Sequence, residues 1–567
     1  MTTAGIDFGT TNSVVSIWTP SGPSVLPIDS PKDARWAELG LDLLMPTVIG
    51  LSPEDETVFG WEAKLGDVPT LEAVKRLLLA EEFVELAGKL FVIEEVVTLF
   101  FAHLRDQALK LAGADIDRVV VTIPANSRGL ARYRTRICAA MAGLEVLALI
   151  NEPTAAAMAV SRRITHDGKV LVVDLGGGTL DVTLLEACDG VFIEQASSGV
   201  PTLGGRDFDS RLAALAVETV SDTDWTASDR RQFAANIERA KILLSTQEFT
   251  NIDLPGGESR RITRAAFNDS IRTLVEKLGP AIDECLQAAQ MDFDLIDHLL
   301  LVGGSCRVPA VRDFVVSKIG KQPSSDVNPM TAISNGAAIA AAILTGELDD
   351  NDFFVSTEHA LGTIATDDSG TSYFSEIIPR NHKLPASKEQ IYLPHLPEQE
   401  SVAIRVIEGR SDHLDHPDNV ILKEWSVALP PPERGDNRQF ALQYNYDVNG
   451  ILHVHARDFL SNEVILDDDV ASGVSGDKSK LAKVAKGARE AMATGRLEAS
   501  TDAAPDDPEA VELIQRANSK VIPFLDDDEA NPIRQLVQTL SAATDASARD
   551  AAKSDLRKSL SRYSYLF

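Results

Sequence analysis

Two hydrophobic periodicities alternate along the first 345 residues, and together they predict an α/β domain. Continuous apolar runs at 119–123 and 299–302 are typical of strands that are buried on both faces. Apolar and small residues at helical spacing predict helices at 128–142 and 336–344. Strands that alternate with helices in this way are typical of mixed α/β folds.

The pattern changes at residue 346. Segment 346–358 is acidic around a short apolar stretch, Phe353-Phe354-Val355, which predicts a linker that can dock. From 359 to 472, short alternating runs are separated by turn signals. The pair Asn449-Gly450 lies between two such runs and predicts a hairpin with a type I′ turn. We therefore expect an antiparallel β domain at 359–472.

The region 473–567 has a helical pattern. It is rich in Ala, Glu and Lys, and Leu481, Val484 and Ala488 recur at helical intervals. Pro532 is predicted to begin the last helix, because proline is well tolerated in the first helical turn. We expect this region to be a set of helices separated by prolines.

One short phrase occurs twice in the α/β region, as Ile6-Asp7-Phe8-Gly9-Thr10-Thr11-Asn12 and as Val173-Asp174-Leu175-Gly176-Gly177-Gly178-Thr179. Each phrase follows an apolar run and precedes an alternating one, which predicts strand, tight turn and strand. Small residues in the turns let backbone N–H groups approach a bulky anion. The aspartate at each strand end could hold a hydrated divalent metal. Two such turns facing each other would bind a nucleoside triphosphate from both sides.

Two further segments carry candidate chemistry, each beside an ordinary structural alternative. Gly303-Gly304 follows a buried strand and suits a flat base or ribose; Ser305 is predicted to N-cap the helix that contains Pro309. Glu238, Lys241 and Ser245 share one face of a predicted helix, and core-type residues occupy the opposite face. Taken alone, these patterns are more typical of an ordinary strand–helix joint and of a solvated helix face. No Walker P-loop or Rossmann glycine phrase occurs in the chain.

Composition narrows the function class. The chain is 44% hydrophobic and 25% charged, which is ordinary for a globular protein. Its net charge of −31 argues against binding to nucleic-acid backbones, which require a basic surface, and against docking to anionic lipid. The four cysteines form no C-x-x-C pair, which argues against a zinc site and favours a reducing compartment. Since no apolar run approaches ~18 residues, we expect a cytoplasmic protein without membrane contact.

Together these phrases resemble the ATPase domain of the 70-kilodalton heat-shock chaperones, the DnaK-like family within the actin and sugar-kinase fold. The resembling segments occur in order along the first domain, at 5–13, 74–77, 151–157, 174–181, 238–245 and 301–309. The resemblance implies a multidomain chain. It comprises an actin-like, ribonuclease-H-like duplicated α/β ATPase domain at 1–345, an interdomain linker at 346–358, an antiparallel β-sandwich that binds peptides at 359–472, and a short α-helical lid, as in the HscC-like branch, at 473–567.

The resemblance also implies a site. ATP or ADP would bind with Mg²⁺, with K⁺ as a second candidate ion, and the metal's water shell would be oriented by Asp7, Glu152 and Asp174. Catalysis would depend on Lys75, Glu152, Asp174 and Thr179. The implied nucleotide-binding residues are Gly9, Thr10, Thr11, Asn12, Gly177, Gly178, Thr179, Glu238, Lys241, Ser245, Gly303, Gly304, Ser305 and Arg307. The implied peptide groove contains Leu361, Tyr392, Val402 and Ile404, although alternating apolar residues of a β domain are also typical of ordinary core.

The implied activity is hydrolysis of ATP to ADP that switches the affinity for extended hydrophobic polypeptide segments. A J-domain co-chaperone and a nucleotide-exchange factor are the implied partners. Val355 replaces a usual linker aspartate and Ala148 a usual arginine, which predicts atypical engagement of these partners. Two alternatives stay open. One is a nucleotide-sensing scaffold for a dedicated client, with weak or no general folding activity. The other is a small-molecule kinase on the same fold, which is disfavoured because no general-base aspartate is identified.

Overall fold

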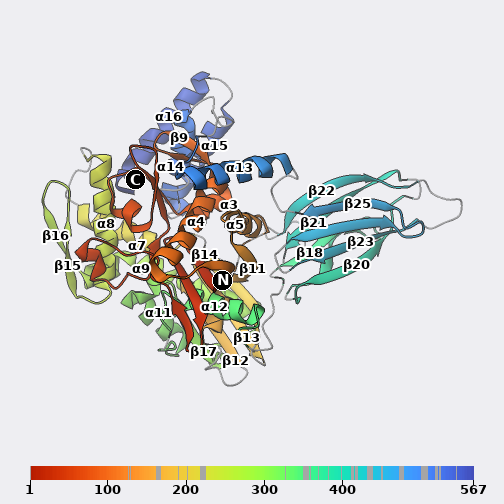
Figure 1. Ribbon diagram of the computed structural model, residues 1–567, viewed down its shortest axis with the longest axis horizontal. Coiled ribbons are helices and arrows are strands. Elements are labelled where there is room, and N and C mark those ends of the chain that lie inside the picture. The colour runs from red at the N-terminus through yellow and green to blue at the C-terminus, as the bar shows by residue number, and fades with distance from the viewer. Residues whose placement is uncertain are drawn as a thin grey trace.

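The computed structural model describes residues 2–125, 127, 129–160, 168–188, 191–200, 202–217, 225–325, 327–348, 357, 359–367, 369–380, 382–396, 399–409, 414, 419–430, 438–447, 451–470, 478–499, 508–517, 521–522, 525, 527–543 and 546–566. A β-sandwich projects from one side of a large α/β body, and the C-terminal helices lie against that body (Figure 1). Within the described residues, no helix combines the length and the apolar character that a membrane span needs.

Two mixed sheets form the centre of the α/β body, and both contain the same strand arrangement. In the first sheet, β1 pairs with β2 as an antiparallel hairpin and with β10 in parallel. In the second sheet, β12 pairs with β13 as an antiparallel hairpin and with β17 in parallel. The strand–turn–strand prediction is thus confirmed for both copies of the phrase. The strands are β1 (Thr2–Phe8), β2 (Asn12–Thr19), β3 (Gly22–Val25), β4 (Met45–Pro46), β10 (Ile116–Ile123), β11 (Glu145–Asn151), β12 (Gly168–Leu175), β13 (Leu180–Cys188), β14 (Val191–Val200) and β17 (His298–Val302).

Helices and small sheets surround the two central sheets. The predicted helices at 128–142 and 336–344 are confirmed as α5 and α12, with shifted ends. These elements are α1 (Ala34–Ala37), β5 (Val48–Leu51), β6 (Thr57–Phe59), α2 (Gly60–Leu65), β7 (Thr70–Glu72), α3 (Val74–Ala80), β8 (Phe83–Leu86), β9 (Lys89–Val92), α4 (Ile93–Ala112), α5 (Gly129–Met141), α6 (Glu152–Met158), α7 (Gly205–Val217), α8 (Ala227–Leu244), β15 (Phe249–Asp253), β16 (Ser259–Thr263), α9 (Arg264–Glu276), α10 (Leu278–Ala288), α11 (Pro309–Ile319) and α12 (Ala332–Leu344).

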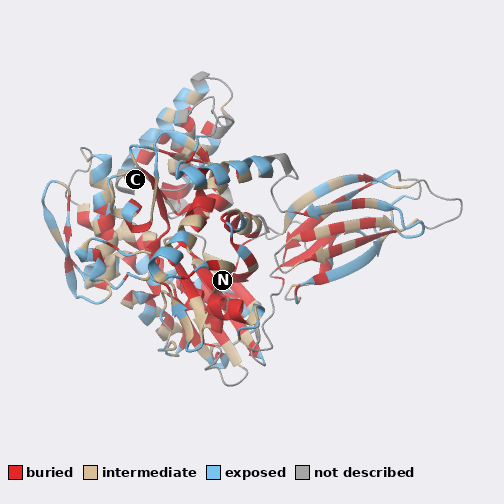
Figure 2. Ribbon diagram, in the orientation of Figure 1, coloured by how far each residue is buried: buried red, intermediate tan, exposed pale blue. Residues whose placement is uncertain are grey.

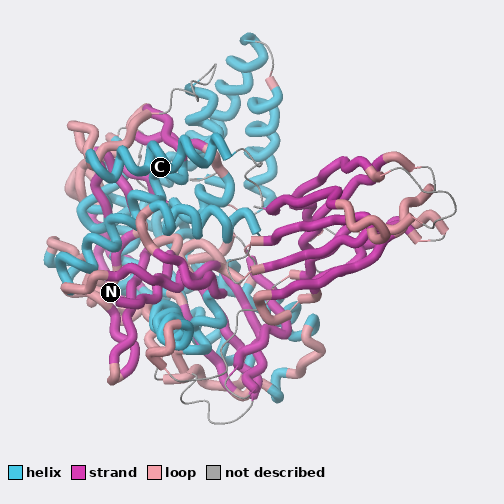
Figure 3. Tube along the Cα trace, turned by 45° about the vertical axis from the view of Figure 1, so that its right-hand side comes forward, coloured by secondary structure: helices cyan, strands magenta, loops and turns pink. Residues whose placement is uncertain are grey.

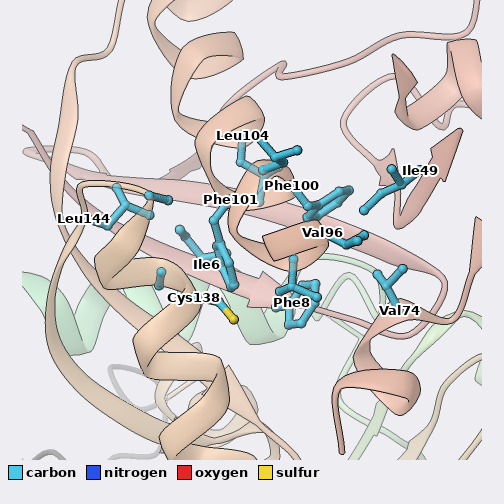
Figure 4. Packing of buried hydrophobic residues seen from close by; sticks show 14 of the residues in the cluster. Ile6, Phe8, Ile49, Val74, Val96, Phe100, Phe101, Leu104, Cys138 and Leu144 are labelled. Carbon is cyan, nitrogen blue, oxygen red and sulfur yellow. The ribbon is translucent and has the colours of Figure 1, made fainter. Parts of the chain in front are cut away.

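A buried aromatic cluster anchors the end of β1. Phe8 packs against Phe100 and Phe101 of α4, with ring centroids 5.9 and 5.0 Å apart (Figure 4). Ile6 and Cys138 belong to the same core. Tilted aromatic pairs of this kind stabilise a core beyond the area that they bury. The cluster therefore fixes the strand end at which the first glycine turn begins.

Helix α12 packs between the two sheets and needs glycine to do so. A side chain on Gly336 would place its Cβ 1.7 Å from the carbonyl oxygen of Ala155 in α6. We predict that Gly336→Ala lowers the free energy of unfolding by about 1–3 kcal/mol, because overpacking forces two buried helices apart. Urea unfolding measures this change.

Gly279 provides the matched control for that substitution. It also lies in a helix, α10, but a Cβ there would come no nearer than 3.4 Å to any neighbouring side chain, the nearest being Phe314, which is an ordinary contact. Gly279→Ala is expected to leave the stability unchanged or to raise it by up to about 1 kcal/mol, the gain in helix propensity. Equal stabilities of the two variants would contradict the packing argument.

The projecting β-sandwich consists of two four-stranded antiparallel sheets. Residues of both sheets form one buried core, and Figure 2 shows buried residues within the strands of the sandwich. The described strands are antiparallel, as predicted, whereas Asn449-Gly450 and the stretch Phe353-Phe354-Val355 lie outside the described residues. One sheet contains β18 (Ala360–Thr366), β19 (Ser372–Ile378), β21 (Ser401–Gly409) and β22 (Val420–Ala428), and the other β20 (Ala386–Tyr392), β23 (Phe440–Tyr446), β24 (Leu452–Asp458) and β25 (Val464–Val470).

The described part of the C-terminal region is helical, as predicted. Figure 3 shows the helices of the chain gathered in the main body and the strands of the sandwich projecting from it. The C-terminal helices are α13 (Lys478–Thr494), α14 (Pro508–Arg516), α15 (Asp527–Ala542) and α16 (Ala546–Leu560). The prediction that Pro532 begins the last helix is wrong, because Pro532 lies inside α15 and α16 follows. Its neighbours Ala530 and Ile533 are buried in a core formed by these helices. The burial of these neighbours compensates for the loss of the backbone hydrogen bond that Pro532 cannot donate.

Helix α13 packs along α4, and one acidic residue lies at the contact. Gly487 of α13 approaches Glu95 so closely that a Cβ at this glycine would lie 2.1 Å from the carboxylate. Burial first, and then repulsion from Glu94, Glu498 and Glu490, raises the pKa of Glu95 to about 7. An acid whose pKa is raised on folding stabilises the contact while it is protonated and loses that contribution as the pH rises through the raised value.

We therefore predict that α13 is held on α4 more firmly at pH 6 than at pH 8. Hydrogen-exchange protection factors of the α13 amides measure this difference. Glu95→Gln should make the protection nearly independent of pH, because its amide carries no charge at either value. A pH dependence that persists in this variant would assign the effect to another group.

Candidate functional site

The two glycine turns contact each other between the central sheets. Gly177 of the turn between β12 and β13 lies against Thr11 of the turn between β1 and β2. A Cβ at Gly177 would lie 1.8 Å from Thr11 Oγ1, so the approach requires glycine. Thr11 Oγ1 is buried and has no hydrogen-bond partner among the described residues. A buried hydroxyl without a partner costs free energy, and a phosphate oxygen would satisfy it.

Three carboxylates lie close to the turns; Glu152 and Asp174 are buried, and Asp7 is half-buried. Asp7 lies one residue before the end of β1 and accepts a hydrogen bond of 3.3 Å from the Thr122 hydroxyl, while Glu152 begins α6 and Asp174 lies near the end of β12. Burial, followed by the charge of Glu152, raises the pKa of Asp7 to about 7 and that of Asp174 well above its usual value. Like charges brought together in a buried site raise each other's pKa, and a bound cation removes this cost.

Lys75 supplies a positive charge to this cluster. Its Nζ lies 2.5 Å from Glu152 Oε1, and the lysine is 4% exposed, so it is not an ordinary surface residue. Lys75 lies on α3, whose end is held by Arg134 of α5. The Arg134 guanidinium donates to the carbonyl oxygens of Leu78 and, at 2.7 Å, of Glu81. Glu152 therefore holds the ammonium directly, and Arg134 holds the far end of the helix that carries it.

A cavity of about 270 Å³ opens beside the turns. Most of the residues that the sequence resemblance assigned to nucleotide binding line it, namely Thr11, Asn12, Gly177, Glu238, Lys241, Ser245, Gly304, Ser305 and Arg307. Gly9, Thr10, Gly178, Thr179 and Gly303 are not among its lining residues. Ile237, Ala240 and Leu244, on the opposite face of α8, are buried in the core, as predicted. The polar face of α8 is thus turned to the cavity rather than to bulk solvent.

The loop after β17 reaches the second glycine turn. Gly303 has φ +81°, and a Cβ there would lie 2.4 Å from the Leu175 carbonyl oxygen. The prediction that Ser305 caps the next helix is wrong, because α11 begins at Pro309 with Val308 as its N-cap. The Ser305 hydroxyl instead donates to the Gly176 carbonyl oxygen at 2.8 Å. Ser305 is therefore joined to the turn rather than to the helix.

Sequence reasoning missed several residues that join the two sides of the cavity. Lys64 Nζ lies 2.6 Å from Glu238, and Arg206 lies 3.2 Å from Glu72. Lys64 also lies over the rings of Trp36 and Trp61, which are 5.2 Å apart, and Trp61 lines the cavity. One sequence pattern lies beside these contacts. The pair Gly204-Gly205, directly before Arg206, places small residues at the start of a helix, as Gly303-Gly304 does after β17.

The residues assigned to a peptide groove lie together in the sandwich. Leu361, Val402 and Ile404 are between 2% and 8% exposed and belong to the core between its two sheets. Tyr392 packs against the same core, and its hydroxyl lies 2.9 Å from that of Ser375. These positions are those of core residues, and a groove role for them stays a prediction.

Comparisons with known proteins agree on one family. A family model described as "Hsp70 protein" matches residues 76–565. A "Chaperone protein DnaK" from Metamycoplasma hominis is 34% identical over 511 residues, which cover 86% of this chain and 82% of that protein. Proteins of the same description from Ureaplasma urealyticum and Ureaplasma parvum are 31% and 32% identical, over 94% and 91% of this chain and 86% and 84% of theirs.

Proposed function

This chain belongs to the Hsp70 family, and from that premise we propose that its two opposed glycine turns bind the phosphates of ATP. The chain is an ATP-dependent chaperone of the DnaK type, and it hydrolyses ATP. In the proposed layout, residues 1–345 form the ATPase domain, 346–358 the linker, 359–472 the peptide-binding β-sandwich and 473–567 a short lid. The observation that carries the proposed site is the contact of both turns close to a largely buried cluster of carboxylates and one lysine.

In the proposed site, Asp7, Glu152 and Asp174 would hold Mg²⁺ through its water shell. Bound there, the ion would neutralise phosphate charge, which is the main requirement of phosphoryl transfer. The backbone N–H groups of the two turns and the Thr11 hydroxyl would bind phosphate oxygens. Lys75, oriented by Glu152, would place its ammonium at the γ-phosphate and the attacking water. Positioning and electrostatic stabilisation together account for large rate increases without covalent chemistry.

On the far side of the cavity, the polar face of α8 and the loop after β17 would hold the nucleoside. Glu238 and Lys241 present a carboxylate and an ammonium, which suit ribose hydroxyls and base edges. Lys241 is itself fixed by hydrogen bonds of 2.7 Å to Asp209 and 3.0 Å to the Gly205 carbonyl oxygen. The clients would be unfolded or extended polypeptides, with J-domain and exchange-factor proteins as co-chaperones in the cytoplasm.

We predict that the affinity for an unfolded polypeptide differs at least tenfold between the ATP and ADP states, about 1.4 kcal/mol of coupling free energy. Fluorescence anisotropy of a labelled apolar peptide, titrated with ATP, ADP and no nucleotide, measures the difference. Equal affinities in all three conditions would contradict coupling between the site and the sandwich. If apolar peptides do not bind at all while one stoichiometric protein partner does, the scaffold alternative is supported instead.

A further inference from the structure

All three glycine carbonyls of the second turn are held by hydrogen bonds. The Gly176 carbonyl oxygen accepts from Gly205 N at 3.0 Å and from the Ser305 hydroxyl at 2.8 Å. The Gly177 carbonyl oxygen accepts from Arg206 N at 2.9 Å. The Gly178 carbonyl oxygen accepts from Arg76 Nη2 at 2.5 Å. The orientation of each of these peptide groups is therefore fixed.

Fixing a carbonyl also fixes the N–H of the next residue. In a trans peptide the C=O of one residue and the N–H of its successor point in opposite directions from one plane. The three held carbonyls therefore orient the N–H groups of Gly177, Gly178 and Thr179 away from those partners. Successive N–H groups oriented in this way form an anion-binding concavity.

The hydrogen bond from Arg76 differs from the others because its donor comes from the opposite side of the cavity. Gly205, Arg206 and Ser305 belong to the same half of the α/β body as the second turn. Arg76 lies on α3, beside Lys75, and its neighbours Val74 and Leu77 are buried in the core of the first sheet. Its guanidinium thus reaches from one side of the cavity to the turn on the other.

The surroundings of Arg76 keep it charged and in place. Burial, and then the charge of Arg206, lowers its pKa only to about 10, so the guanidinium remains protonated near neutral pH. A Cβ at Gly178 would lie 3.0 Å from the Arg76 guanidinium carbon. The contact therefore depends on glycine at 178 as well as on arginine at 76.

We propose that Arg76 is a positioning residue that orients the 178–179 peptide group, and with it the Thr179 N–H, only when the two sides of the cavity are closed on each other. This inference rests on the proposed ATP site. Lys75 and Arg76 are adjacent on α3. The proposal therefore implies that the Lys75 ammonium and the second glycine turn reach their working positions together.

Steady-state ATP hydrolysis and calorimetric binding of Mg·ATP and Mg·ADP by the full chain test the proposal. Arg76→Met is expected to lower kcat roughly tenfold, because the Thr179 N–H would no longer be placed at the transition state. The midpoint of thermal unfolding should stay near that of the parent chain. Arg76→Lys, which keeps a positive donor, should recover part of the loss. Arg272→Met, at an exposed arginine of α9 paired with Asp269, is the control and should leave kcat unchanged.

A second variant keeps the test decisive if Arg76→Met folds poorly. Gly178→Ala displaces the guanidinium without removing it and should produce a similar loss of kcat. The double variant should lose no more than the worse single variant, because both changes break one contact. Unchanged kcat in both single variants, or losses that multiply in the double variant, would overturn the proposal. Failure of the parent chain to bind Mg·ATP would instead overturn the proposed site.

Discussion

Replacing Lys75 with alanine should reduce ATP turnover at least a hundredfold while ATP binding changes only a few-fold. Lys75 is the ammonium at the carboxylate cluster, and a donor at a developing negative charge typically contributes about 10²–10³ in rate. Binding depends mainly on the glycine turns and on the face of α8, which this change leaves intact. Single-turnover hydrolysis, combined with calorimetry, separates the two quantities.

The same substitution leaves Glu152 buried without its ion-pair partner, which costs about 3–5 kcal/mol of stability. Urea unfolding must therefore accompany the kinetics. Lys89→Ala is the matched control, since Lys89 pairs with Asp55 at 2.6 Å but both side chains are about half exposed. This control should lose neither activity nor measurable stability. Normal turnover by Lys75→Ala would remove Lys75 from the proposed catalytic role.

The second large effect is expected from Gly177→Ala. The new Cβ would lie 1.8 Å from Thr11 Oγ1 and 2.9 Å from Thr11 Cβ, so rotation of the threonine side chain does not relieve the overlap and the two turns would have to separate by up to about 1 Å. A displacement of about 1 Å at a reacting centre can cost about a hundredfold in rate. We therefore expect kcat/KM for ATP to fall by about that factor, with a large share of the loss in ATP affinity.

Gly176→Ala is the control for this substitution. Gly176 precedes Gly177 in the same turn, yet a Cβ there would have only the Thr179 carbonyl oxygen nearby, at 4.0 Å. The loss in this variant should be several-fold at most. Similar losses for the two alanines would show that the turn tolerates no side chain at either position, and that contact between the turns is not the cause.

The features that the sequence predicted well depend on local information. A glycine-rich turn between an apolar and an alternating run is encoded within a few residues, and both copies fold as strand, turn and strand. The apolar stripe of α8 at Ile237, Ala240 and Leu244 follows from helical periodicity in the same way. These particular elements therefore follow from local patterning alone.

The features that sequence reasoning missed depend on contacts between distant segments. No local pattern shows that Arg134 holds the end of α3, or that Lys64 and Glu238 meet across the cavity. Ser305 shows the same limit: its position before a helix suggested a cap, whereas tertiary structure places its hydroxyl on Gly176. At Pro532 the packing of neighbouring residues outweighed the local preference of proline.

The tilted pair of indole rings, Trp36 and Trp61, has a practical consequence. Indole emission responds to nearby charge, and the ammonium of Lys64 lies 5.1 and 5.3 Å from the two ring centroids. The carboxylate that balances this ammonium, Glu238, belongs to the opposite wall. Separation of the walls would leave the indoles beside an unbalanced positive charge. We therefore expect the indole emission of the native chain to change if the walls separate, so that such a motion could be followed without an attached dye.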